Sequence, residues 1–213
     1  MPYASWTRTR STLAAMRQRG WRILATPETL KGSRGKRPPY WPADGAPAPY
    51  ALDNGAWGVF KRGAKFEDDV FLWAVDRLGE GADWVVMPDV VADREATLER
   101  AERWFPRLEG LNLLLAVQDG MTADDVLPWL SRGVGIFVGG STEWKLKTIR
   151  EWAPLAHHHG QHCHVARVNT CKRIALCKHF GVDSVDGKSV VMFPSTMSRL
   201  DNAFRQQSLW GSK

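Results

Sequence analysis

From residue 50 onward, short apolar runs alternate with longer segments whose apolar residues recur at helical spacing, and this alternation limits the possible folds more than any other feature. Strands that alternate with helices of about 10–15 residues are typical of parallel β-α-β units. The runs predicted as strands are Tyr50–Leu52, Trp84–Met87, Leu113–Val117, Val134–Val138, His164–Val168 and Val182–Val185. The segments predicted as helices are Phe66–Leu78, Arg94–Trp104, Ala123–Leu130, Trp144–His157 and Thr170–Phe180.

The N-terminal part of the chain adds a predicted helix over residues 8–20, which ends at Gly20, and a seventh strand over residues 21–25. Residues 31–49 are rich in Gly and Pro and are predicted to form a long loop. An eighth strand is expected either at Ser189–Phe193 or in the N-terminal region. We therefore predict an α/β fold, a compact (β/α)8 TIM-like barrel in a single domain over residues 1–213. A doubly wound open sheet has the same alternation.

Composition excludes several classes of protein. Hydrophobic residues make up 44% and charged residues 24% of the chain, which is typical of a globular protein and not of a disordered one. No stretch approaches the roughly 20 apolar residues that a membrane-spanning helix requires, and Met1–Arg10 contains no apolar signal core. The three cysteines, Cys163, Cys171 and Cys177, are an odd, clustered set, which favours a reducing cytoplasm over a disulfide framework.

The net charge of +6 is concentrated in a basic N-terminal region, residues 1–49. Up to residue 37 there are nine Lys or Arg residues and one acidic residue, whereas the remaining chain has 20 basic and 22 acidic residues. An excess at one end suits contact with nucleic-acid phosphates. Trp6, Trp21 and Trp41 lie in the same region and could stack on bases. The alternative is a basic surface that is only solvated.

Polar residues follow the predicted strands at the point where each strand ends. The carboxyl ends of parallel strands share one face of the fold, where active sites are assembled. Residues far apart in the sequence are therefore expected to converge there. Taken singly, Asp or Gly after a strand more commonly caps the next helix or forms the turn. The residues concerned are Asp53, Asn54, Asp89, Gln118, Gly139, Gly140, Ser141 and Asp186.

Three carboxylates and an amide in one site are suited to chemistry at a glycosidic carbon. One carboxylate can attack the anomeric carbon and form a covalent glycosyl intermediate. A second can carry the proton to and from the leaving and entering base. A third can accept the N–H donors of the Watson–Crick edge of guanine, while amide donors hold its carbonyl. Crowded carboxylates also raise one another's pKa, which suits acid–base work near neutrality.

Five segments, in order, resemble the tRNA-guanine transglycosylases. Ala51–Phe60 (ALDNGAWGVF) resembles the Asp-Ser-Gly-Gly-Phe-Gln-Val-Phe signature of that family. The resemblance extends over residues 50–187, about two thirds of the chain, and implies a TIM-like barrel that exchanges guanine. The further matching segments are Val86–Asp89 with Ala101–Trp104 after it, Ala116–Gly120, Gly135–Gly140, and His164–Val168 followed by Gly181–Asp186.

The resemblance implies a role for each matching residue. Asp186 would be the covalent nucleophile and Asp53 the general acid and base. Asp89 would bind the N–H edge of the purine. The other substrate-binding residues would be Gln118 and the Gly140 backbone amide at the purine carbonyl, with Gly139 and Asn54 beside them.

The sequence departs from the tRNA enzymes after the nucleophile. Those enzymes carry a zinc-binding Cys cluster there, whereas Gly187 follows Asp186 here and no Cys occurs beyond Cys177. Of the cluster His157, His158, His159, His162 and His164, the first three are expected to end a helix at the bottom face of the barrel. We therefore expect no zinc-binding subdomain, no bound metal and no cofactor.

Without the zinc subdomain, the chain is similar to the phage-encoded DNA-guanine transglycosylases, which insert 7-deazaguanine (queuosine-related) bases such as the 7-cyano form. The implied partners are DNA and a free 7-deazaguanine base, and the location is the host cytoplasm if a phage encodes the chain. In duplex DNA the target guanosine must leave the stack. Arg34, Lys36 and Arg37 are predicted to grip the opened strand. Lys145 or Glu143 stands where the tRNA enzymes use a glutamate near the 7-substituent.

Three alternatives remain open on the sequence alone. The same site could act on tRNA or on a free nucleoside. Gly139-Gly140-Ser141 could instead cradle a phosphate in a barrel isomerase or decarboxylase, which would leave the three aspartates unexplained. The third alternative is a nucleic-acid-binding barrel without catalysis.

Overall fold

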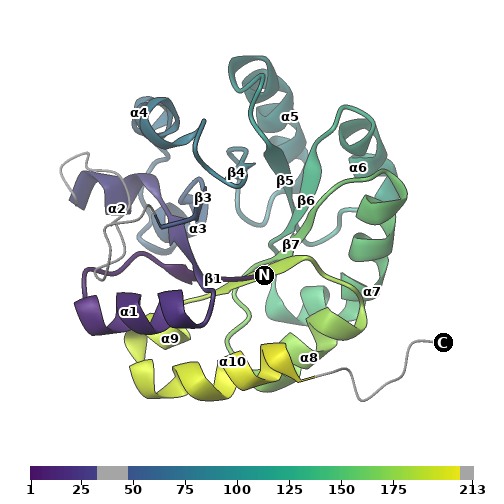
Figure 1. Cartoon of the computed structure of the whole chain (residues 1–213). Coiled ribbons are helices and arrows are strands. Elements are labelled where there is room, and N and C mark those ends of the chain that lie inside the picture. The colour runs from purple at the N-terminus through teal and green to yellow at the C-terminus, as the bar shows by residue number, and fades with distance from the viewer. Residues whose placement is uncertain (33–47, 207–213) are drawn as a thin grey trace.

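The computed structural model describes residues 1–32 and 48–206, and its eight strands form one closed, all-parallel barrel with helices around it (Figure 1). Each strand pairs with its neighbours in sequence, and β1 also pairs with β8, which closes the barrel. This confirms the (β/α)8 prediction over the open sheet. The strands are β1 (Pro2–Ser5), β2 (Arg22–Ala25), β3 (Tyr50–Leu52), β4 (Val85–Val86), β5 (Leu113–Val117), β6 (Gly135–Val138), β7 (Cys163–Val165) and β8 (Ser184–Gly187).

The eighth strand is the N-terminal segment Pro2–Ser5, between β2 and β8, and the alternative at Ser189–Phe193 is wrong because residues 189–192 are helical. The six predicted helices are present, and α2, α3, α9 and α10 add to them. The helices are α1 (Arg10–Gln18), α2 (Pro27–Gly32), α3 (Ala56–Lys61), α4 (Asp68–Leu78), α5 (Arg94–Trp104), α6 (Ala123–Leu130), α7 (Thr142–His158), α8 (Cys171–His179), α9 (Ser189–Met192) and α10 (Met197–Arg205), with 3-10 turns at Phe105–Arg107 and Pro194–Thr196.

Side-chain caps stabilise the first turn of three helices that follow strands. Asp93 accepts a hydrogen bond from the Ala96 amide at the start of α5, and Ser141 accepts one from the Trp144 amide at the start of α7. Thr170 caps α8 in the same way through the Arg173 amide. Such caps satisfy amides that have no partner within the helix. The short connections therefore turn the chain back at the carboxyl ends of the strands.

Side chains alternate across the barrel wall, as the pleat of a strand requires. Outward residues such as Ile23, Val85 and Ile136 pack against the surrounding helices in the main core. Inward residues form a second, separate cluster that fills the lower part of the barrel. That cluster comprises Tyr3, Leu24, Ala51, Trp84, Val86, Leu114, Ala116, Phe137 and Ala166.

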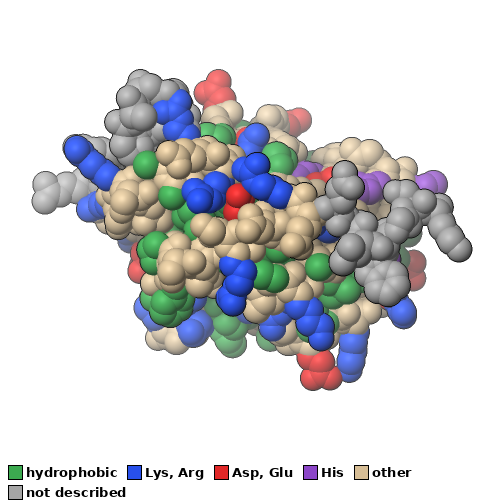
Figure 2. Space-filling model, turned by 60° about the horizontal axis from the view of Figure 1, so that its bottom comes forward, with side chains coloured by type: hydrophobic (Ala, Val, Ile, Leu, Met, Phe, Trp, Pro, Cys, Tyr) green, Lys and Arg blue, Asp and Glu red, His purple; other side chains and the backbone are tan. Residues whose placement is uncertain are grey.

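The basic N-terminal region is only partly described. Arg19, Arg22 and Lys31 form ion pairs with Asp201, Asp83 and Glu67, so much of its described charge is neutralised locally. Figure 2 views the side of α1 and α10, where Lys and Arg side chains are scattered. The remaining basic residues predicted to grip DNA, Arg34, Lys36 and Arg37, lie outside the described residues, as does Trp41.

Two further sequence expectations concern membranes and thiols. Within residues 1–32 and 48–206, the structure contains no helix with the length and apolarity needed to cross a bilayer. Cys163, Cys171 and Cys177 are all free thiols. Of the loop predicted over residues 31–49, Lys31 and Gly32 instead belong to α2, and residues 33–47 lie outside the described residues.

Candidate functional site

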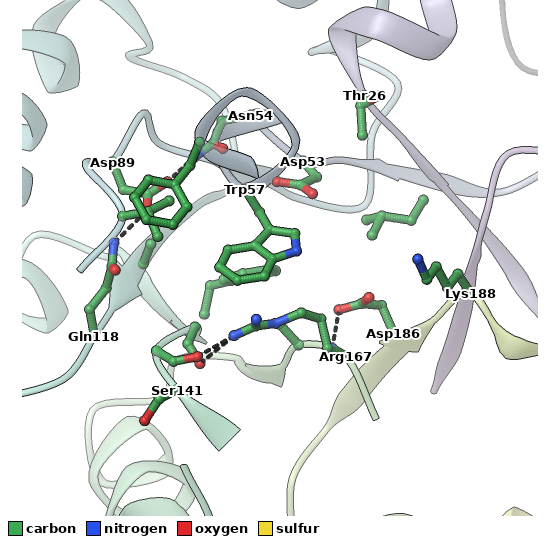
Figure 3. A pocket seen from close by; sticks show the side chains of 18 of the residues that line it. Thr26, Asp53, Asn54, Trp57, Asp89, Gln118, Ser141, Arg167, Asp186 and Lys188 are labelled. Atoms are coloured by element: carbon green, nitrogen blue, oxygen red, sulfur yellow. Dashed lines mark hydrogen bonds between the residues drawn. The ribbon is translucent and has the colours of Figure 1, made fainter. Parts of the chain in front are cut away.

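A cavity of about 560 Å³ opens at the carboxyl ends of the strands, and Asp53, Asp89 and Asp186 all line it (Figure 3). Its volume lies within the range of about 300–1,000 Å³ that is usual for small-molecule sites. Inward side chains of the lower barrel layer, including Ala116 and Ala166, form part of its lining. The other predicted substrate-binding residues, Asn54, Gln118, Gly139 and Gly140, line the same cavity.

Asp89 is held by two neighbouring amide side chains. Asn54 Nδ2 donates to Asp89 Oδ1 at 2.7 Å and to the Met87 carbonyl at 2.7 Å. Gln118 Nε2 donates to the other carboxylate oxygen of Asp89. Burial raises the pKa of Asp89 to about 6, although these hydrogen bonds act in the opposite direction. The network fixes the plane of the Asp89 carboxyl group at the cavity wall.

The position of Gln118 differs from its predicted role at a purine carbonyl. Its Oε1 accepts a hydrogen bond from the Ala92 amide at 2.7 Å, while its Nε2 faces Asp89. Both ends of the amide therefore have protein partners, and the side chain is buried. Gln118 orients Asp89 in this arrangement, and one of its bonds would have to open before it could contact a base.

Asp53 and Asp186 face the cavity from β3 and β8. Asp186 Oδ1 accepts hydrogen bonds from His164 Nε2 at 3.0 Å and from the Arg167 backbone N–H at 3.1 Å. Asp53 Oδ1 accepts from the Gly55 amide at 3.2 Å. Burial, reinforced by the negative charge of Asp186, raises the pKa of Asp53 to about 7. One carboxyl group of this pair is thus poised to gain and lose a proton near neutral pH.

Arg167 is a cavity residue that the sequence analysis did not identify. It has a positive φ of 59°, which is uncommon for a residue other than glycine and is found disproportionately at functional sites. Its guanidinium donates to the Gly140 carbonyl and lies 4.3 Å from the centre of the Trp57 ring. The backbone of Arg167 thus contacts Asp186, while its side chain contacts the opposite wall of the cavity.

Trp57 lies in the Ala51–Phe60 segment, where no sequence pattern predicts a role for it. It lines the cavity from α3, is 44% exposed, and stacks with Phe60 at a centroid distance of 5.9 Å and an interplanar angle of 24°. In Figure 3 its ring lies between Asp89 and Asp186 in the view into the cavity. A partly exposed indole at a cavity mouth offers a flat apolar surface to a planar ligand.

Lys188, which follows β8, also lines the cavity and is exposed.

Two predicted positions do not reach the cavity. Lys145 is buried and its Nζ donates to the Ala166 carbonyl, while Glu143 is exposed and pairs with Lys147. Neither residue belongs to the cavity lining. The expectation that one of them lies near the 7-substituent of a base therefore has no support in this arrangement.

The Gly139-Gly140-Ser141 turn already holds a carboxylate. The backbone N–H of Ser141 donates to Asp119 Oδ2 at 2.6 Å, and its hydroxyl donates to Asp119 Oδ1 at 2.5 Å. These are the donors at the start of α7 that a phosphate would need. Gly140 adopts a φ of 55°, and a Cβ there would lie 2.6 Å from the Trp144 ring. The glycine is thus required by the turn itself.

Gly187, which stands where the tRNA enzymes have a zinc-binding Cys, has no room for a side chain. A Cβ at this position would lie 2.7 Å from Asn169 Oδ1 and 2.8 Å from the Val168 carbonyl oxygen. Within the described part of the chain, no group of three or more His, Cys, Asp or Glu side chains is placed to hold a metal ion. His157 and His158 end α7 at the bottom face, where His157 contacts Asp183.

No protein-family model matches this chain, and no curated protein matches it either. The geometry of the cavity is therefore the basis for assigning a function.

Proposed function

We propose that the protein is a base-exchange glycosyltransferase, a pentosyltransferase of the guanine transglycosylase type. It replaces guanine in DNA with a 7-deazaguanine such as 7-cyano-7-deazaguanine. The observation that carries the proposal is the meeting of Asp53, Asp89 and Asp186 around one cavity, although 133 positions separate the first from the last (186 minus 53). Their environments differ in a way that suits three different roles.

In the first step, Asp186 attacks C1′ of the target nucleoside. A C1′–O bond forms and the C1′–N9 bond breaks, with its electron pair passing to the departing guanine. Asp53 donates a proton to that base, so guanine leaves as a neutral molecule. Because the pKa of Asp53 is raised to about 7, a substantial fraction of this group is protonated at neutral pH.

In the second step, the incoming base takes the place of guanine. Its N9–H proton passes to the Asp53 carboxylate as N9 forms a bond to C1′, and the C1′–O bond to Asp186 breaks. Both aspartates return to their starting states, and two displacements retain the configuration at C1′. The cycle consumes no cofactor, because one glycosidic bond is exchanged for another.

Recognition of the base is assigned to Asp89 and Trp57. The carboxyl oxygens of Asp89 can accept from paired N–H donors, which guanine and 7-deazaguanines present on one edge. Trp57 supplies a face on which a purine can stack, and such stacking is worth about 1–3 kcal/mol per base. A base that lacks the paired N–H donors would leave Asp89 buried with fewer partners, which disfavours its binding.

DNA is the proposed polymer, with RNA as the second candidate. In a duplex the guanosine has to leave the stack before C1′ can reach a cavity at the end of a barrel. Phe60 and Lys188 lie at the cavity and could contact the opened strand. The phosphate-barrel alternative is disfavoured by the Asp119 carboxylate, which already accepts both donors of Ser141.

The proposal is tested by incubating the protein with radiolabelled guanine and duplex DNA, single-stranded DNA or tRNA in parallel. We expect label to enter DNA with the wild-type protein and not with Asp186→Ala or Asp53→Ala. A matched control is Asp124→Ala, which removes an exposed carboxylate of α6 outside the cavity. Incorporation by the Asp186 variant at the wild-type rate would remove its role, and label entering tRNA alone would favour the RNA enzyme.

A further inference from the structure

His164 places an imidazole ring among the aromatic side chains of the lower layer of the barrel interior. Its side chain is fully buried. The imidazole is stacked on the Phe137 ring with a centroid distance of 4.9 Å and an interplanar angle of 10°. The centroid of the Trp84 ring lies 4.6 Å from that of the imidazole. Tyr3 contacts its edge at 5.9 Å. Because three aromatic side chains surround it, the ring has little freedom to rotate or shift.

Both nitrogens of this ring have partners, and together they form a chain of hydrogen bonds through the barrel. His164 Nε2 lies 3.0 Å from Asp186 Oδ1, and its Nδ1 lies 2.7 Å from Ser184 Oγ. The same hydroxyl lies 2.7 Å from His162 Nε2, and the His162 side chain is 21% exposed. The chain thus runs from the cavity toward the bottom face of the barrel.

One direction of donation satisfies every group in this chain. A carboxylate only accepts, so His164 Nε2 must carry the hydrogen that is directed at Asp186. Nδ1 of a neutral His164 then accepts from the Ser184 hydroxyl, whose oxygen accepts from His162 Nε2–H. Burial lowers the pKa of His164 and lowers that of His162 to about 4, so both rings are neutral at pH 7. Ser184 therefore fixes which tautomer His164 adopts.

Charged groups around His164 act on its pKa in both directions, and burial outweighs them. Burial is the largest influence on its pKa, the N-terminal amino group and Lys145 also disfavour a second proton, and Asp186 opposes them. The Tyr3 hydroxyl points away from the ring toward Asp83, to which it donates at 2.9 Å. His164 thus acts as a neutral donor to Asp186 and not as its cationic partner.

The geometry points to a role for His164 as a positioning residue for Asp186, an inference that rests on the proposed base exchange. His164 Nε2–H and the Arg167 amide both donate to Oδ1, which leaves Oδ2 of Asp186 to attack C1′. Two N–H donors also stabilise a carboxylate over a carboxylic acid. The two donors thus fix the plane of the Asp186 carboxyl group, as Asn54 and Gln118 fix that of Asp89.

A purely structural role does not explain this side chain. An apolar ring such as that of the neighbouring Phe137 would suit this aromatic layer, whereas a buried imidazole costs free energy unless its nitrogens are hydrogen-bonded. Both nitrogens are bonded here, and one partner is the side chain that would attack the sugar. The cost of burial is thus offset by an interaction that serves the cavity.

Three variants separate positioning from packing. His164→Phe keeps an aromatic ring and removes both nitrogens. His164→Gln retains an N–H donor that can reach the position of Nε2. Ser184→Ala leaves His164 in place and removes the hydroxyl that fixes its tautomer. We expect kcat for base exchange to fall about 10- to 100-fold in His164→Phe with KM nearly unchanged, the factor associated with one hydrogen bond to a charged group.

The variants should differ in their pH profiles as well as their rates. In His164→Phe the acid limb of kcat/KM should move to higher pH, because a carboxylate that loses an N–H donor holds its proton more tightly. His164→Gln should restore part of kcat and move the limb back. Equal kcat and the same acid limb in wild type, His164→Phe and Ser184→Ala would overturn the inference. If His164→Phe fails to fold, the other two variants decide in the same way.

A measurement that needs no activity keeps this inference distinct from the proposed function. Imidazole ¹H–¹⁵N NMR of the wild-type protein should show His164 protonated at Nε2, with that signal displaced in Asp186→Asn and the tautomer mixed in Ser184→Ala. If the wild type exchanges no base and the NMR signals behave so, the proposed function fails and the hydrogen-bonded positioning of Asp186 stands. A His164 protonated at Nδ1 in the wild type would overturn it.

Discussion

The carboxyl groups at the two ends of the barrel interior differ in their hydrogen-bond and ion-pair partners. At the N-terminal ends of the strands, Asp83 accepts hydrogen bonds from the Tyr3 hydroxyl at 2.9 Å and from the Arg22 guanidinium. At the same end, Asp183 Oδ2 lies 3.0 Å from His157 Nε2 and accepts a hydrogen bond from the Cys163 backbone N–H. Each acid therefore has partners of complementary charge or polarity, and this end resembles an ordinary stabilising network.

At the carboxyl ends, three acids share one cavity, and their hydrogen-bond donors are amide, imidazole and backbone N–H groups rather than a guanidinium such as that of Arg22. Among the residues in 1–32 and 48–206, no Lys or Arg side chain lies within ion-pair distance of Asp53, Asp89 or Asp186. Burial raises the pKa of Asp53 to about 7 and that of Asp89 to about 6. Buried carboxyl groups with raised pKa values reduce the stability of the folded state, and such groups are concentrated at functional sites. The comparison predicts that changes at one end reduce activity and changes at the other reduce stability.

The largest effect is expected for Asp186→Asn. The amide cannot form the covalent ester, so base exchange should fall at least about a thousandfold. Because the change removes one negative charge from the cavity, the free energy of unfolding should stay within about 1 kcal/mol of wild type or rise. Incorporation of labelled guanine and chemical denaturation measure the two quantities. A large loss of stability with activity retained would reverse the proposed division between the two ends.

The next largest effect concerns Asp53 and depends on pH. Its pKa is raised from an ordinary value of 3.8 to about 7, so the folded state holds this proton more tightly than the unfolded state does. Stability is therefore lost as pH rises from about 4 to about 7, by up to about 4 kcal/mol from this group. In Asp53→Asn that loss should be absent.

The test of Asp53 compares unfolding free energies of the wild type and Asp53→Asn at pH 5 and pH 8. The variant should gain on the wild type between the two pH values, even though it exchanges bases poorly at both. Equal pH dependence in the two proteins would show that the cavity does not raise the pKa of Asp53. Asp124→Asn, on the exposed surface of α6, is the matched control.

The sequence predicted most of the barrel because burial gives parallel strands a simple signature. Leu113–Val117 is apolar at every position and is buried throughout, as expected for a strand between a filled interior and covering helices. The sequence does not reveal the strand at Pro2–Ser5, because four residues that include Pro and Ser carry little periodicity. Ser189–Phe193 has a β-branched pair and was a plausible strand, yet it forms α9.

The candidate site was predicted in part, for a topological reason. Asp53, Asp89 and Asp186 follow or end strands, so the shared face of parallel strands brings them together. The inward direction of His164 depends on the register of β7 with β6 and β8, which a three-residue strand does not reveal in sequence. Arg167 lies beyond the strand end at a positive φ, and no local sequence pattern predicts that conformation.

At the N-terminal end of the barrel, Asp83→Asn should reduce stability and leave base exchange unchanged. The change removes the charge that Arg22 and Tyr3 contact, in a pair whose side chains are 30% and 26% exposed. We expect a loss of about 1–2 kcal/mol in the free energy of unfolding, because a charged hydrogen bond is weakened at a partly solvated site. A marked fall in kcat at unchanged stability would link this end to the cavity and contradict the comparison.

The smallest effect is expected for Glu143→Gln, a change in the first turn of α7 on the exposed surface. Glu143 and its partner Lys147 are 81% and 72% exposed, and the surrounding water screens such a pair so that it contributes little to stability. Stability and base exchange should therefore match wild type, as should the preference between guanine and 7-cyano-7-deazaguanine measured in competition. The residues that face the 7-substituent must then come from the cavity lining itself, where Asp119, Ser141 and Arg167 are the nearest polar candidates around Gly140. A changed preference in this variant would instead require Glu143 to reach the base when DNA is bound.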